Sequence, residues 1–204
     1  MRLPILLTSF VASFVLVSPV SFSGELLDID NELNRVKAHY IAKNYGQAAD
    51  KLTKIADTLR GYKAREMATF LPMAPTGWVQ MEDGEKNYGG SGLIAGGSMT
   101  MRAYQKGVDK VEVTIMLDNP LMKSMGQLAS IANFADFGVK TYKGGILKYE
   151  AGDPKKAWEK ESKLMLVLGS DGIAVEVAGE GMSEETAMLF LHGMDIDKMV
   201  DQFE

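Results

Sequence analysis

Residues 163–178 have the sequence KLMLVLGSDGIAVEVA, and this stretch decides the class of fold. Two apolar runs rich in strand-forming residues, 163–169 and 173–178, flank the turn Ser170-Asp171-Gly172. Asp and Gly tolerate the positive φ angles that tight hairpin turns require. The stretch therefore predicts two antiparallel strands joined by a short turn.

Further strand-like segments precede this hairpin and are separated by glycine. Gly107-Val108-Asp109 predicts a second hairpin turn between two of them. Sequential hairpins indicate an antiparallel meander. The predicted strands are 77–82, 97–106, 110–117 (with Val111, Val113, Ile115 and Leu117 on one face), 139–143, 145–150 and 157–161.

Two helices are expected within this series of strands. Asp118 or Asn119 is a capping residue before Pro120, which favours a mid-domain helix from that point. Ser183 caps a C-terminal helix that closes at Gly193, and the tail 195–204 is expected to form one further helical turn.

The N-terminal part of the mature chain has helical periodicity. Apolar residues recur every three or four positions over 25–63, with a break at Asn44-Tyr45-Gly46 and a predicted C-cap at Gly61. Two helices joined by a short turn form an αα-hairpin. The run 37–59 resembles one tetratricopeptide unit, but a solenoid needs about three repeats. We therefore expect a single helical hairpin that packs on the following domain.

These elements together predict an α+β fold. It consists of an N-terminal helical hairpin and a mainly antiparallel twisted sheet with one mid-domain and one C-terminal helix. The predicted domains are a signal peptide at 1–23, the helical hairpin at 24–66 and the antiparallel α+β domain at 67–204.

The signal peptide is predicted from the first 23 residues. Arg2 precedes an apolar run to about Val17, and Ser21 and Ser23 are small residues before a cut at Gly24. An uncleaved N-terminal anchor is the alternative. We expect an exported, periplasmic protein with no integral membrane span after cleavage, and secretion beyond the cell is the second possible destination.

Composition limits the function classes. The formal net charge of −5 and the lack of a Lys/Arg stripe argue against nucleic acid as a partner. The chain has no cysteine, which excludes disulfides, thiolate catalysis, Cys-ligated metal and a bacterial lipoprotein, whose lipid is attached to a cysteine.

Part of the chain resembles a known family. The motifs are FLPMAPTGW at 70–78, the helix after DNP at 118–120, and FLHGMDIDKM at 190–199. Together with the sheet order they are similar to the PsbP-like superfamily of α+β domains, which includes small DcrB-like periplasmic proteins. The resemblance implies an accessory or binding role without site residues to carry over, and the helical hairpin and the glycine-rich insert depart from it.

The glycine-rich segment NYGGSGLIAGGS, residues 87–98, is the most unusual local composition in the mature chain. A phosphate-binding loop needs a following helix and a closing Lys, and this segment has neither. A flap that contacts a partner is our interpretation. Its candidate residues are Gly89, Gly90, Gly92, Leu93, Ile94, Gly96 and Gly97.

Fourteen methionines in an exported chain raise the alternative of a soft-metal carrier, because thioethers suit copper(I). Met99 and Met101 share a predicted strand face, and Met122 and Met125 share a helix face. Methionine also fills irregular gaps in a core, and packing is the simpler interpretation.

No catalytic signature is present in the sequence. His39 and His192 lack a nucleophile elbow or any other local marker, so a hydrolase with an unrecognised site stays a third alternative. We expect no catalytic residue, no cofactor and no metal site. The prediction is a non-enzymatic binding or accessory protein whose partner is a protein or an envelope component.

Overall fold

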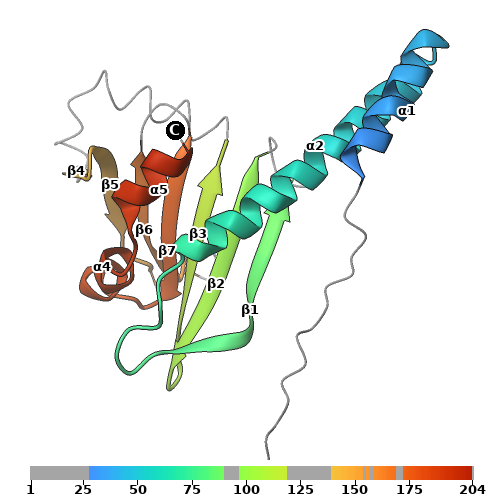
Figure 1. Cartoon of the computed structure of the whole chain (residues 1–204). Helices are drawn as coiled ribbons and strands as arrows, with labels where there is room; N and C mark the ends of the chain where they lie inside the picture. Colours follow the sequence, from blue (N-terminus) through green and yellow to red (C-terminus); the bar gives the residue numbers. More distant parts are fainter. Residues whose placement is uncertain are drawn as a thin grey trace, which may run out of the picture.

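The computed structural model describes residues 28–89, 97–118, 139–153, 155–156, 159–168 and 172–203. Within these residues, seven strands form one antiparallel sheet in the order β1-β2-β3-β7-β6-β5-β4 (Figure 1). The strands are β1 (Val79–Gly89), β2 (Ser98–Lys106), β3 (Asp109–Leu117), β4 (Val139–Tyr142), β5 (Gly145–Glu150), β6 (Glu161–Leu168) and β7 (Ile173–Glu180). The helices are α1 (Ile29–Ile41), α2 (Tyr45–Met67), the short 3₁₀ helix η1 (Ala68–Phe70), α4 (Glu184–His192) and α5 (Ile196–Phe203).

The predicted α+β class is confirmed, with a helical hairpin before an antiparallel sheet. The single meander needs a correction, because β1-β2-β3 and β4-β5-β6-β7 are two separate meanders. They join where β3 pairs with β7, with Val113 opposite Val177. The predicted mid-domain helix after Pro120 lies outside the described residues.

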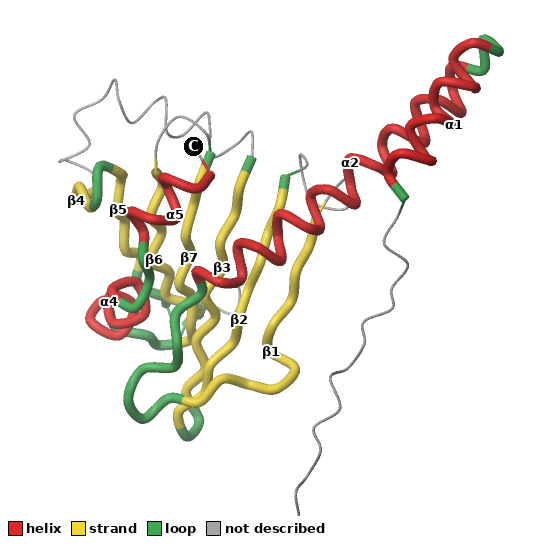
Figure 2. The backbone as a smooth tube through the Cα atoms, viewed as in Figure 1, coloured by secondary structure: helices red, strands yellow, loops and turns green. Residues whose placement is uncertain are grey.

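The described helices that contact the sheet lie on one of its faces. The C-terminal part of α2 crosses β1 and β2, while α4 packs on β6 and β7 (Figures 1 and 2). Successive residues of a strand point to opposite faces, so every second residue meets these helices. In β3 these residues are Val111, Val113, Ile115 and Leu117, as predicted, and all four are buried.

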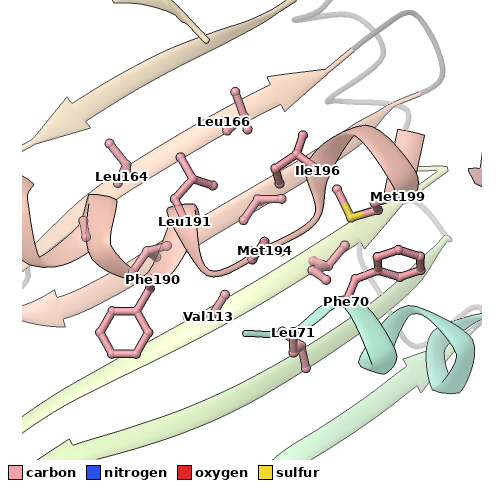
Figure 3. Packing of buried hydrophobic residues seen from close by; sticks show 14 of the residues in the cluster. Phe70, Leu71, Val113, Leu164, Leu166, Phe190, Leu191, Met194, Ile196 and Met199 are labelled. Carbon is pink, nitrogen blue, oxygen red and sulfur yellow. The ribbon is translucent and has the colours of Figure 1, made fainter. Parts of the chain in front are cut away.

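The core forms between this sheet face and the helices (Figure 3). Phe190 of α4 is its centre, with its ring 5.2 Å from that of Trp78 and 4.9 Å from that of Tyr104. Each large apolar side chain that is fully buried contributes about 1.5–3 kcal/mol. The other fully buried large residues include Met67, Leu164, Leu166, Leu191 and Met199.

Two polar side chains of β2 attach the end of the helical region to the sheet. The guanidinium of Arg102 donates to the carbonyls of Ala68 and Leu71, at 3.3 and 3.4 Å, and pairs with Glu85. The hydroxyl of the fully buried Tyr104 donates to the carbonyl of Pro72. These bonds hold the segment that follows α2 against the sheet.

The prediction that Gly61 ends the second helix is wrong. α2 continues from Tyr45 to Met67, and Gly61 lies where β1 approaches it. A Cβ atom on Gly89 would lie 2.3 Å from the backbone nitrogen of Gly61. Glycine at position 89 therefore serves close packing of the strand on the helix.

Two further boundaries differ from the prediction. The strand expected at 157–161 is not formed at Glu159 or Lys160, because the backbone N–H of Asp153 donates to the Glu159 carbonyl and closes a turn instead. Residues 157 and 158 lie outside the described residues. The tail forms the complete helix α5, since the Asp195 side chain accepts from the N–H of Lys198 and Met199 is buried.

Candidate functional site

The helical hairpin extends away from the sheet (Figure 1). Asp28 caps α1 by accepting from the N–H of Asn31 at 3.1 Å. Lys43, with φ of 60°, turns the chain between the helices, and α2 begins after Asn44. The break predicted at Asn44-Tyr45-Gly46 is found slightly earlier, at 42–44, since Tyr45 and Gly46 already belong to α2. It places α1 antiparallel beside the N-terminal half of α2.

A narrow contact holds the two helices of the hairpin together. Ala48 and Ile55 of α2 are buried, whereas α1 has no buried residue along its 13 positions. On one side of this contact, Glu32 of α1 accepts from the Nζ atom of Lys51 at 2.9 Å. The hydrogen bond to Lys51 is the main reason that the pKa of Glu32 is lowered.

The other side of the contact carries large apolar side chains that remain exposed. Leu33 and Tyr40 of α1 are 44% and 64% exposed. Tyr45, Leu52 and Leu59 of α2 are 59%, 48% and 47% exposed. We call these five residues the apolar hairpin face.

Helical spacing puts the five residues on one face. Leu33 and Tyr40 are seven positions apart, as are Tyr45, Leu52 and Leu59, and seven residues return to nearly the same side of an α-helix. The rings of Tyr40 and Tyr45 lie 5.8 Å apart across the turn, so the two stripes adjoin. The sequence prediction does not include this face, because periodicity does not separate these five residues from the other apolar positions that recur over 25–63. The seven-residue spacing was the available signal.

The predicted flap is described only at its two ends. Gly89 closes β1 against Gly61, and Gly97 has a φ of 102°, with the Leu117 carbonyl 2.6 Å from the position of a Cβ atom. These two glycines thus have structural reasons to be glycine. The other flap residues, Gly90, Gly92, Leu93, Ile94 and Gly96, lie outside the described residues.

The methionines divide between the two faces of the sheet. Met99 lies opposite Met116 in the β2–β3 register, and Met101 is two positions along the same strand face. This face is opposite the one that carries Tyr104 and the core. Met122 and Met125 lie outside the described residues.

An open cavity of about 510 Å³ lies at the end of the sheet formed by the β2–β3 turn. Its lining includes Met81 and Ala103 and the carboxylates of Glu112, Glu161 and Glu180. Burial raises the pKa of Glu112, and the neighbouring charge of Glu161 adds to this effect. In the part of the chain that the structure describes, no group of three His, Asp or Glu side chains is placed to hold a metal ion.

The two histidines lie in separate parts of the fold. His39 belongs to α1, which packs on α2, and the ring of His192 in α4 lies 6.0 Å from that of Tyr142. Of the two tryptophans, Trp78 is buried, while Trp158 lies outside the described residues.

Among the described residues, no helix is long and apolar enough to cross a bilayer. Protein-family models, curated proteins and solved structures provide no match to this chain.

Proposed function

We propose that this chain is an exported, non-enzymatic accessory protein that binds a protein partner through the apolar hairpin face. The observation that carries the proposal is the set of five large apolar side chains, all at least 44% exposed, on one side of two adjacent helices. Single exposed apolar residues are ordinary on a protein surface, whereas a contiguous apolar patch is typical of an interaction site.

The shape of this surface indicates the kind of partner. Apolar residues at seven-residue spacing on two antiparallel helices form a stripe against which a further helix can pack. Amphipathic helices bind apolar surfaces of this kind through residues spaced by three, four and seven. Ala49 and Ala56 of α2 lie between the large residues in the same stripe and allow close approach of a helix.

Two sequence features support the cellular context of the proposal. The predicted signal peptide at 1–23 directs the chain to the periplasm, where it meets exported and envelope proteins. The resemblance of residues 70–199 to the PsbP-like superfamily implies the same accessory role. The flap at 89–97 stays a predicted second contact.

Photo-crosslinking tests the proposal. A photoreactive amino acid at Leu52 reports on the apolar hairpin face, and the same amino acid at Val108 is the matched control, since Val108 is 93% exposed in the β2–β3 turn. We expect a discrete protein adduct from position 52 in intact cells and none from position 108. Equal labelling from both positions, or none from either, would contradict the proposal.

A soft-metal carrier is the second candidate function, and the β2–β3 register favours it. Directly opposed residues in antiparallel strands have Cβ atoms about 5 Å apart, and diagonal neighbours about 7–8 Å. The thioethers of Met99, Met101 and Met116 are therefore within reach of one another, and three thioethers suit copper(I).

Titration with copper(I) separates this candidate from the first. If the chain is a carrier, one equivalent binds the mature chain and is lost when Met99, Met101 and Met116 are all changed to Leu. Leucine keeps the apolar packing, and Met73→Leu, at a residue that is 88% exposed, is the control that should bind normally. Absence of stoichiometric binding rejects the carrier.

A further inference from the structure

We infer that the occupant of the apolar hairpin face is a second copy of this chain, with the two hairpins packed antiparallel as a four-helix bundle. This inference rests on the proposed function, because it names the partner of the same surface. Three observations support it: the seven-residue spacing of the apolar hairpin face, the charged residues beside this face, and the exposure of α1 in the single chain.

The apolar hairpin face is complementary to itself. On α2, Tyr45 and Leu59 lie seven positions before and after Leu52. A two-fold axis that crosses the helices at Leu52 sets Leu52 against Leu52 of the partner subunit and Tyr45 against Leu59 of the partner subunit. The three large apolar residues of α2 then meet only large apolar residues, as an isologous interface requires of a self-complementary surface.

The charges beside the face favour the antiparallel arrangement. Asp30 and Lys37 are seven positions apart on α1 and flank Leu33 on its exposed side. Under the same two-fold axis, α1 packs antiparallel on α1 of the partner. The acidic N-terminal part of α1 in one subunit therefore lies beside the more basic C-terminal part of α1 in the other. Asp30 then lies near Lys37 of the partner subunit, and the symmetry repeats this pair.

The hairpin also lacks the packing that a bundle would supply. All 13 residues of α1 remain at least partly exposed, and α1 packs against α2 through one side. Helices this short are marginal in water unless tertiary packing covers an apolar face. In a four-helix bundle the apolar hairpin face becomes the central seam between two helix pairs.

The charges of the hairpin do not oppose self-association. Residues 28–60 contain five acidic and six basic side chains, so two copies meet with little net repulsion although the whole chain is acidic. Only a second copy of the chain presents a Lys37 to Asp30 and an Asp30 to Lys37. An anionic lipid surface or an unrelated helix does not offer this reciprocal pair of charges.

Sedimentation velocity on the full mature chain, from Gly24 onward, tests the inference. We expect a dimer at micromolar concentration. Leu52→Glu places two carboxylates together on the axis, so it should give a monomer with unchanged helix content by circular dichroism. The matched control Val108→Glu introduces the same charge at an exposed apolar residue away from the face, and should remain a dimer.

A charge exchange tests the arrangement itself. Asp30→Lys and Lys37→Asp should each weaken the dimer about tenfold or more, and the double exchange should restore it. Because the chain has no cysteine, Leu52→Cys should form a disulfide-linked dimer on mild oxidation, whereas Val108→Cys should not.

The outcomes distinguish this inference from the proposed function. A wild-type chain that stays monomeric at about 100 µM overturns the second copy as occupant. If position 52 then crosslinks to a different protein in cells, the proposed function stands without the dimer. If the dimer forms but is insensitive to Leu52→Glu, the inferred bundle is wrong.

Discussion

Tyr104 and Arg102 show how single polar residues position a large element. Both project from β2 toward the helices and bond to carbonyls between Ala68 and Pro72, where the helical region ends. Along β2, Thr100, Arg102 and Tyr104 alternate with the more apolar Met99, Met101 and Ala103. The first set nevertheless faces the helices. Thr100 and Tyr104 are fully buried and Arg102 is partly buried, and the last two supply hydrogen-bond donors to the chain above them.

Removing the Tyr104 hydroxyl tests this role. Tyr104→Phe keeps the ring against Phe190 but leaves the buried Pro72 carbonyl with only the longer, 3.5 Å contact from Arg102. Unfolding by urea should show a loss of about 1–2 kcal/mol. An unchanged free energy of unfolding would show that this hydrogen bond does not hold the segment.

Glu112 makes a pH-dependent contribution to stability. Burial, with Glu161 nearby, raises its pKa above the ordinary value of 4.5, so the folded state binds the proton more tightly than the unfolded state. The charged form therefore destabilises the fold increasingly as the pH rises above about 4.5.

Glu112→Gln should accordingly raise the melting temperature at pH 7–8 and have little effect below pH 4. Thermal unfolding followed across this range measures the difference. A variant that is less stable than the wild type at neutral pH would contradict the assigned environment.

At the scale of elements, the crossing of α2 and β1 depends on a glycine in β1, Gly89. Sequence reasoning assigned Gly61 to a helix end, since glycine commonly follows the last helical residue. The helix instead continues to Met67, and the close approach restricts Gly89, whose Cβ atom would lie 2.3 Å from the backbone nitrogen of Gly61. A Cβ atom on Gly61 itself would have no neighbour within 4 Å. No local sequence pattern predicts such a contact between residues far apart in the chain.

Gly89→Ala should therefore destabilise the protein by about 2–3 kcal/mol, because its Cβ atom meets backbone atoms that cannot move independently. Gly46→Ala is the matched control within α2, where a Cβ atom has no neighbour within 4 Å. It should be neutral or slightly stabilising, since alanine favours helix. Equal stability of the two variants, measured by urea unfolding, would reject the close crossing.

At the scale of the whole molecule, local sequence patterns predict which helices and strands form better than they predict how these elements are arranged. Alternating residues and the turn at Gly107 predict strands and hairpins, and both are found. Pairing of β3 with β7 joins segments about sixty residues apart, and no turn specifies it. The apolar hairpin face could not be predicted either, because periodicity identifies apolar residues on a helix but does not show which of them stay exposed to solvent.

The central claim is that this face is covered when the protein is in its natural setting. Single-cysteine variants test it directly, since the chain has no cysteine of its own. Leu59→Cys and Val108→Cys are placed at residues that are both exposed in the single chain, at 47% and 93%. In intact cells treated with a thiol reagent that enters the periplasm, we predict that position 108 is labelled and position 59 is protected until the protein is denatured. Rapid labelling at both positions would contradict the account.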